Sequence, residues 1–194
     1  MTKILDCTFR DGGYYTNWDF NSDVVDVYIK SMNRLPVDYI ELGYRNNPSN
    51  EYMGKFGYCP VSELKHIRQS CAKKLSIMIN EKSTVLEDLD HLLGPINGIV
   101  DMVRIAIDPS NFERALILAQ RVKQMGFEIG LNVMYMSKWK TEYPDFYSSL
   151  NLLDDFADLF CMVDSYGGVT PDDITDIVQE IRKYTKCPIG FHGH

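Results

Sequence analysis

Several features that would place a protein in a class at once are missing from these 194 residues. No apolar run approaches the ~18–20 residues that a membrane-spanning helix needs. Residues 1–6 lack a basic segment followed by a long apolar one, so we expect no secretion signal there. The formal net charge is −7 and no Lys/Arg run occurs, which disfavours binding to the phosphates of nucleic acids.

Cysteine is also sparse and poorly arranged for cross-linking. The five cysteines are an odd number, and no Cys-x-x-Cys spacing occurs among them. This argues against a disulfide framework and against a zinc ribbon. We therefore expect a cytoplasmic protein with neither a membrane nor a nucleic acid as partner.

What the sequence does contain is a regular alternation of short apolar segments and longer segments of helical period. Hydrophobic residues make up 45% and charged residues 24%, as in ordinary globular domains. The short segments resemble strands that are buried on both faces. They are residues 3–8, 39–43, 75–80, 102–107, 128–134, 159–164 and 187–192. The predicted helices between them are residues 21–32, 60–72, 83–93, 109–126, 147–157 and 170–181.

Repeated strand–helix units predict a parallel sheet, either a doubly wound open sheet or a (β/α)8 barrel. The dinucleotide-binding form of the open sheet has Gly-x-Gly-x-x-Gly in its first strand-to-helix turn. Residues 10–14, where we expect that turn, read Arg-Asp-Gly-Gly-Tyr instead. Polar residues at nearly every strand end favour the barrel.

The predicted fold is therefore an α/β (β/α)8 TIM barrel, truncated after strand 7. We predict that residues 1–194 form a single TIM-barrel catalytic domain that is incomplete at the C-terminus, because a barrel needs eight strands. A seven-stranded barrel would expose the backbone edges of two strands. The alternative is a complete seven-stranded protein.

The polar residues at the strand ends form the candidate site, because active sites of such barrels lie there. Glu41, on the second strand, has an alternative structural role, pairing with Arg10 or Arg104 inside the barrel. The residues predicted to bind substrate are Glu41, Arg104, Asn132, Asp164 and Ser165.

His192 and His194 are the sharpest local signal. Side chains at i and i+2 of a strand point to the same side, so two imidazoles there can bind one metal ion. Asp11 ends the first strand, which would lie in the same sector of a closed barrel. One carboxylate and two imidazoles suit a divalent ion such as Mn, Mg, Zn or Co. The alternatives are a tag remnant or an unrelated pair of histidines.

Arg10 precedes Asp11 and would supply a fixed cation for a carboxylate or an enolate oxygen. The alternative is a surface Arg-Asp pair in a turn, because Asp-Gly-Gly is a common turn sequence. Residues 135–143 form a longer loop that is either a lid or a packed surface loop.

These residues together resemble the DRE-TIM metallolyase superfamily, and most of all its 4-hydroxy-2-oxovalerate aldolase-like barrel domains. The resemblance rests on Thr-Phe-Arg-Asp-Gly-Gly at residues 8–13 and Phe-His-Gly-His at residues 191–194. Residues 41–43, Arg104 and residues 164–168 support it. It implies a barrel in which a divalent metal binds a 2-oxo acid and stabilises the enolate formed when a carbon–carbon bond breaks or forms.

Carried over to this chain, the resemblance implies that Asp11, His192 and His194 hold the metal and that Arg10 steadies the developing negative charge. The aldolases of the family have an acid/base His three residues after the metal-binding Asp. This chain has Tyr14 there, which is predicted to be catalytic although Tyr is a weaker base at neutral pH. The alternatives are that Tyr15 or another group performs this step, or that the substrate differs. This departure puts the substrate in doubt.

The function predicted from these residues is a metal-dependent lyase that cleaves a 4-hydroxy-2-oxo acid to pyruvate and an aldehyde. The alternatives are a Claisen-type acyl-CoA acyltransferase of the isopropylmalate or homocitrate synthase kind, or a non-catalytic metal-binding barrel. The expected partners are a small 2-oxo acid as substrate and either further copies of the chain or a missing C-terminal domain.

Overall fold

The computed structural model describes residues 2–194 and contains one parallel sheet. Its seven strands are hydrogen-bonded in the order of the sequence, β1 to β7. All six neighbouring pairs are parallel. The strands are β1 (Leu5–Asp6), β2 (Tyr39–Tyr44), β3 (Lys74–Asn80), β4 (Met102–Ile107), β5 (Glu128–Val133), β6 (Leu159–Asp164) and β7 (Ile189–Gly193).

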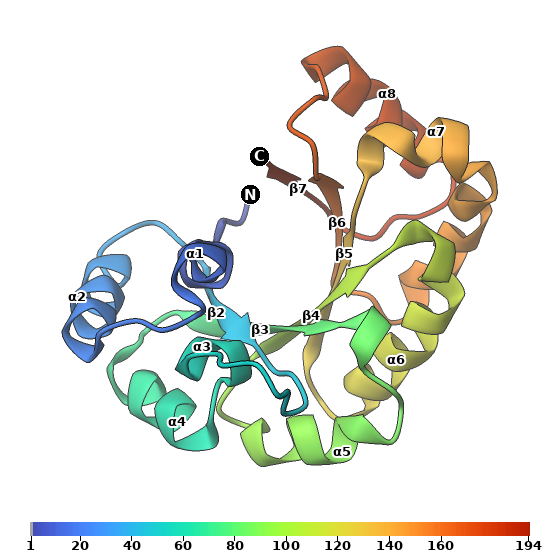
Figure 1. Ribbon diagram of the computed structural model, residues 1–194. Coiled ribbons are helices and arrows are strands. Elements are labelled where there is room, and N and C mark those ends of the chain that lie inside the picture. Colours follow the sequence, from blue (N-terminus) through green and yellow to red (C-terminus); the bar gives the residue numbers. More distant parts are fainter. Residues whose placement is uncertain (1) are drawn as a thin grey trace.

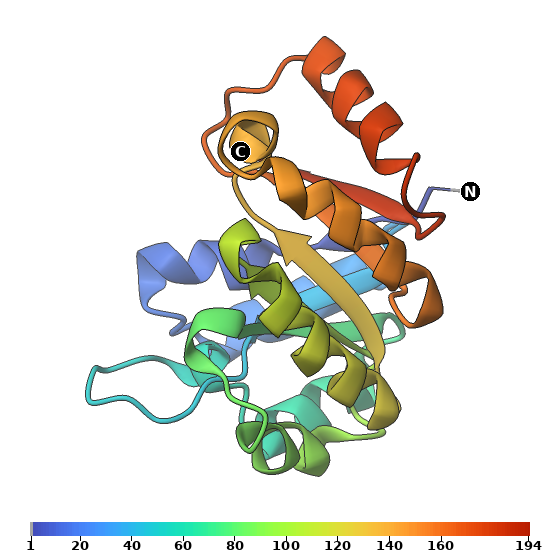
Figure 2. The same cartoon turned by 90° about the vertical axis from the view of Figure 1, so that its right-hand side faces the viewer.

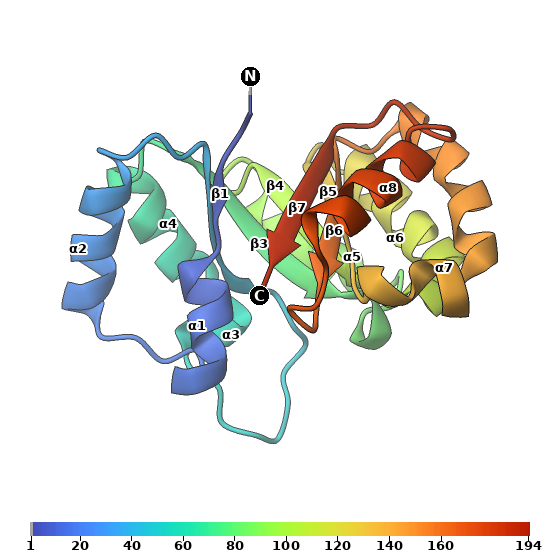
Figure 3. The same cartoon turned by 90° about the horizontal axis from the view of Figure 1, so that it is seen from above.

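The sheet curls around a central axis and leaves a gap between β1 and β7 (Figure 1). The α-helices are α1 (Thr8–Thr16), α2 (Ser22–Met32), α3 (Lys55–Tyr58), α4 (Val61–Ser70), α5 (Asp88–Leu93), α6 (Phe112–Gln124), α7 (Trp139–Glu142) and α8 (Pro171–Ile181). Most helices, including α2, α4, α5, α6 and α8, lie on the outer side of the curl (Figures 1 and 2). α1 continues from the end of β1, with α3 beside it (Figure 3). This arrangement confirms the predicted fold, a TIM barrel truncated after its seventh strand.

The central strands are apolar because both of their faces are covered. All six residues of β4 are buried, and so are five of the six in β5 and in β6. Ile77, Ile105 and Ile129 have no exposed surface and lie in one apolar core with helix residues such as Ala115 and Ala119. Parallel sheets with helical crossovers produce this near-continuous apolar pattern rather than a strict alternation.

Helix starts follow local capping chemistry. At α8 the Thr170 side chain accepts from the backbone N–H of Asp173, and the Asp173 carboxylate accepts from the backbone of Thr170. This reciprocal capping box, with Pro171 in the first turn, confirms the helix predicted to begin there. The Asn21 side chain caps α2 in a simpler way, by accepting from the backbone of Asp23.

The structure corrects the turn predicted at residues 10–14, which belong to α1 instead. The cause is a side-chain contact just beyond the helix. A Cβ on Gly13 would come within 2.0 Å of the Trp18 ring, so only glycine admits the indole there. The Trp18 Nε1 donates to the carbonyl of Arg10 at 3.0 Å. The glycine therefore serves the packing of a helix against Trp18 rather than a turn.

Two further expectations need revision after β5. The α-helix predicted for residues 147–157 is a 3-10 helix, η5 (Pro144–Asp155). Residues 135–143 form η4 (Met136–Lys138) and α7, and the side chains of Met136 and Trp139 are buried. This segment packs against the body, so the lid alternative is not supported.

Among the described residues 2–194, no helix combines the length and the apolar character that crossing a membrane requires.

Candidate site at the carboxyl ends of the strands

A buried ion network occupies the middle of the curled sheet. Glu41 on β2 is fully buried and accepts from two arginines. The Nε of Arg10 donates to its Oε2 at 2.9 Å, and the Nη1 of Arg104 donates to both carboxylate oxygens at 3.0 Å. The two arginines share one buried carboxylate. Removing any of the three groups would leave a buried charge without its partner, so the ion pairs fix all three side chains.

Arg104 on β4 also donates to the side-chain oxygen of Asn132 on β5. The neighbouring Gly130 makes room for it, since a Cβ there would lie 2.9 Å from the Arg104 Cγ. Glu41, Arg104 and Asn132 therefore lie together inside the barrel. That they bind substrate stays a prediction, and the pairing anticipated for Glu41 is present with both arginines.

Arg10 connects this network to the strand ends. Its Nη1 pairs with Asp11 and its Nε with Glu41, while its buried Nη2 has no hydrogen-bond partner among residues 2–194. Burial disfavours the charged guanidinium, but Glu41 and Asp11 outweigh that effect and raise the pKa of Arg10. Arg10 thus carries a permanent positive charge and one unpaired donor.

Beside Arg10 lies a cluster of three groups that can bind a metal, Cys7, Asp11 and His192. One ligand atom of each lies within 4.8 Å of the other two. The thiol of Cys7 donates to Asp11 Oδ2 at 3.0 Å and lies 3.8 Å from His192 Nδ1. Asp11 Oδ2 is 3.5 Å from His192 Nε2. Asp11 and His192 meet as expected, but Asp11 lies on α1 and not at the end of the first strand, which is β1 (Leu5–Asp6).

The protonation state of His192 suits a cation, whereas the Cys7 thiol stays protonated in the absence of one. Burial lowers the pKa of His192 although Asp11 opposes the shift, so the imidazole is neutral at pH 7 and offers a lone pair. Burial, followed by the hydrogen bond to Asp11, raises the pKa of the Cys7 thiol to about 12. A carboxylate, a neutral imidazole and a sulfur atom at this spacing fit a divalent metal ion.

His194 lies next to the cluster without being part of it. Its ring centroid is 4.9 Å from that of His192, at an interplanar angle of 77°. Its Nδ1 donates to the backbone carbonyl of Asp164 at 2.8 Å. A hydrogen bond of this kind fixes the tautomer of metal-binding histidines and leaves Nε2 as the ligand atom. The role of His194 as a ligand stays a prediction.

Asp164 and Ser165, at the end of β6, hold loops. The Asp164 carboxylate accepts from the backbone N–H groups of Gly168 and Val169, both at 3.2 Å. Ser165 Oγ accepts from the backbone of Tyr135 at 3.0 Å. These contacts shape the rim of the barrel mouth, and a direct role in substrate binding stays a prediction for both residues.

Tyr14 lies on α1, and its hydroxyl is 2.8 Å from that of Tyr44 at the end of β2. Burial, followed by Tyr14, raises the pKa of Tyr44, so this phenol remains protonated. Sequence reasoning missed Tyr44 and Cys7. Both stand at strand ends, the position that singled out the other candidates, but a Tyr or Cys there is usually a packing residue.

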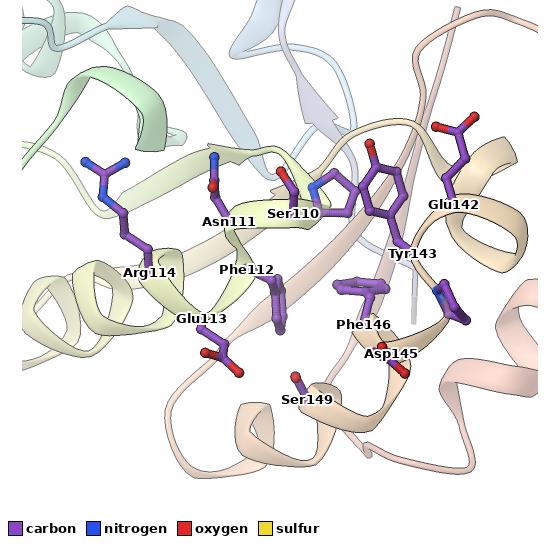
Figure 4. Close-up of a pocket in the computed structure, with 12 residues that line it drawn as sticks. Ser110, Asn111, Phe112, Glu113, Arg114, Glu142, Tyr143, Asp145, Phe146 and Ser149 are labelled. Carbon is purple, nitrogen blue, oxygen red and sulfur yellow. The ribbon is translucent and has the colours of Figure 1, made fainter.

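Two cavities of the structure differ in their relation to these groups. One of about 780 Å³ lies inside the curled sheet, mainly toward the amino-terminal ends of the strands at Tyr39 and Glu128, and reaches His192 on β7. Another of about 490 Å³ lies in the outer layer between the start of α6 and η5, with Phe112 facing Phe146 (Figure 4). None of the predicted site residues lines the outer pocket, so we place the candidate site at the strand ends.

The curled parallel sheet with charged side chains at its strand ends defines an aldolase-like TIM-barrel domain. No family model matches the chain. The chain is 65% identical to a solved structure described as the N-terminal domain of a candidate aldolase from Bacteroides vulgatus. The TM-score is 0.97, and the match covers 100% of this chain and 64% of that one.

Curated relatives are more distant. The chain is 24% identical over 196 residues to a 4-hydroxy-2-oxovalerate aldolase of Geobacillus thermodenitrificans, and 23% identical over 201 residues to an oxaloacetate decarboxylase of Mycobacterium tuberculosis. Each match covers 98% of this chain and 56% of the relative, so the chain spans a little over half of their length. These similarities confirm the resemblance to DRE-TIM aldolase-like barrel domains.

The fold also matches the carboxyl transferase domain of Rhizobium etli pyruvate carboxylase. The TM-score is 0.76 at 14% identity, covering 100% of this chain and 35% of the other. At this identity the match supports the TIM-barrel fold alone.

Proposed function

We propose that the protein is a lyase of 2-oxo acids that uses a divalent metal ion, and that it cleaves a 4-hydroxy-2-oxo acid to pyruvate and an aldehyde. The observation that carries the proposal is the position of Arg10. Its buried guanidinium is held by Glu41 and Asp11 and keeps one donor, Nη2, unpaired beside the cluster of metal-binding groups. The 2-oxo acid chemistry named for the relatives above needs such a cation.

The metal would be held by Asp11 and His192, with His194 as a third ligand. A bound divalent ion supplies Lewis-acid stabilisation of the negative charge that develops on the oxygen of an enolate. Arg10 acts on the same charge from the protein side. Because Glu41 and Asp11 fix its side chain before substrate arrives, its donor needs no reorganisation during the reaction.

A base must remove the proton of the 4-hydroxyl group before the carbon–carbon bond breaks. We propose Tyr14 for this step, with Tyr44 as its neighbour. Tyr44 stays protonated because it is buried, and its hydroxyl lies 2.8 Å from that of Tyr14. A hydrogen bond from Tyr44 would stabilise negative charge on the Tyr14 oxygen and so favour proton removal by that group.

The test is pyruvate release by the full-length protein from 4-hydroxy-2-oxo acids of increasing chain length, with oxaloacetate in the same panel. Retro-aldol cleavage of a 4-hydroxy-2-oxo acid releases an aldehyde, and decarboxylation of oxaloacetate releases CO2. Both reactions leave the enolate of pyruvate, so Arg10 serves either one. Arg10→Lys keeps the charge but loses the forked donors, and we expect kcat to fall by about 10²–10³-fold. Arg34→Lys, the same change at an exposed position, is the control.

Failure to release pyruvate from any acid in the panel would reject the lyase. Release of free thiol from acetyl-CoA in the presence of a 2-oxo acid would then favour the acyltransferase alternative. An unchanged physiological activity in Arg10→Lys would favour a barrel that binds a metal without catalysis. The cytoplasmic location and the assembly with other copies or a further domain stay predictions.

A further inference from the structure

Cys7 differs from the other cysteines of the chain. Cys59, Cys71, Cys161 and Cys187 are buried, whereas Cys7 is partly accessible. Its side chain makes no capping hydrogen bond, although the residue stands at the N-cap of α1. Its thiol instead faces Asp11 and His192. The contact with Asp11 lies within the first turn of α1, whereas the contact with His192 joins Cys7 to a strand 185 residues away in sequence.

The three groups of this cluster lie close enough to be ligands of one metal ion, because one ligand atom of each is within 4.8 Å of the other two. Metal–ligand bonds of about 2.0–2.3 Å place neighbouring ligand atoms about 3–4 Å apart. The Cys7 sulfur lies 3.0 Å from Asp11 Oδ2 and 3.8 Å from His192 Nδ1. Asp11 and His192 are both metal ligands in the proposed function.

We propose that Cys7 Sγ is a further ligand of this metal ion and that it directs the site toward zinc or cobalt rather than magnesium or manganese. The inference rests on the metal site of the proposed function. On binding, the S–H bond breaks, the proton passes to solvent and a sulfur–metal bond forms without any change of oxidation state. Thiolates favour soft and borderline ions, whereas an Asp/His site accepts Mg²⁺ and Mn²⁺ as well.

The experiment is a titration of the metal-free, full-length protein with Co²⁺, followed by absorption. A sulfur ligand produces a thiolate-to-cobalt charge-transfer band in the near ultraviolet, separate from the visible d–d bands that any coordinated cobalt shows. We expect both signals in the unaltered protein and in Cys71→Ser, the matched control at a buried cysteine. We expect Cys7→Ser to retain the d–d bands, to lose the charge-transfer band and to bind Co²⁺ at least about tenfold more weakly.

The outcomes separate this inference from the proposed function. Visible d–d bands without charge transfer in the unaltered protein would overturn the role of Cys7 and leave the metal site intact. In that case the thiol acts only as a hydrogen-bond donor to Asp11. Absence of any cobalt signal would overturn both proposals. The measurement on the unaltered protein decides these cases even if Cys7→Ser does not fold.

A competition between Zn²⁺ and Mn²⁺ tests the preference itself. We expect the ratio of their affinities to shift toward Mn²⁺ by at least about tenfold in Cys7→Ser relative to Cys71→Ser. An unchanged ratio would contradict the proposed selectivity.

Discussion

Two regions at the centre of the barrel carry charge in different ways. In the closed sector from β2 to β5, the carboxylate of Glu41 accepts hydrogen bonds from Arg104. The side-chain oxygen of Asn132 accepts another from the same arginine. At the open edge between β1 and β7, Asp11 and His192 contact Cys7, and their side chains are partly accessible. The first region satisfies most of its polar groups internally, whereas the second presents acceptors to the barrel mouth.

The comparison teaches that charge density alone does not mark a reactive site. A buried group whose partners are complete has little capacity left for a ligand, however unusual its burial. Arg10 belongs to both regions, because it pairs with Glu41 on one side and with Asp11 on the other. Its Nη2 has no hydrogen-bond partner among residues 2–194, so the buried network holds a free donor in position at the open edge.

The largest effect is expected when the shared anion of the closed sector is removed, which tests whether this region is structural. Glu41→Ala leaves Arg10 and Arg104 buried without their common partner, and we expect a loss of about 3–5 kcal/mol in the free energy of unfolding. Denaturant unfolding followed by circular dichroism measures it. Glu63→Ala, which removes a pair with the exposed Lys55, should cost about 0–1 kcal/mol. Equal losses in the two variants would show that the central network is not structural.

An intermediate effect is expected at the rim, for Asp164→Asn. Burial works against the charged carboxylate, but backbone N–H groups of Val169 and Gly168 outweigh it and lower the pKa of Asp164. The stabilisation is therefore present above the ordinary carboxyl pKa of about 3.9 and is lost as the pH falls through the lower folded value. We expect the variant to lose about 1–3 kcal/mol at pH 7.

The same variant should also unfold with less dependence on pH below about 4, because the group that titrates there is gone. Unfolding curves at pH 7 and at acid pH measure both effects. An acid dependence as steep as that of the unaltered protein would contradict the role given to Asp164.

The smallest change in stability is expected at the open edge. Asp11→Asn removes a partly exposed partner of Arg10, which still has Glu41, so unfolding should change by about 0–1 kcal/mol. Metal binding should nevertheless be lost, which calorimetric titration with Mn²⁺ or Zn²⁺ would detect. A variant that is strongly destabilised yet still binds metal would reverse the contrast between the two regions.

Much of this architecture could be predicted from the sequence. β2 to β6 agree with the expected strands within one residue at either end, because apolar runs there end at polar positions such as Asp164. The meeting of Asp11 with His192 followed from the rule that strand ends converge in a barrel. The pairing of Glu41 with both arginines was anticipated as one of two roles.

What could not be predicted depended on side-chain contacts that the local sequence pattern does not reveal. α1 was missed because Asp-Gly-Gly favours a turn locally, whereas the fit of Trp18 against Gly13 decides the matter. Cys7 was missed because a cysteine after an apolar strand is usually inert core, and only the position of His192 gives it a different meaning. Both cases are tertiary contacts overriding local preference.

The order of the sheet has a consequence for how the protein folds. Every strand pairs with the next one along the chain, so the sheet is able to grow by adding one neighbour at a time. Cys7 and His192, by contrast, are 185 residues apart in sequence and meet only across the gap. We expect this contact to form only after the strands between them have paired, because closing a long loop of unfolded chain costs conformational entropy. The metal-binding groups should therefore come together late in folding, and the appearance of the cobalt spectrum during refolding would measure when they do.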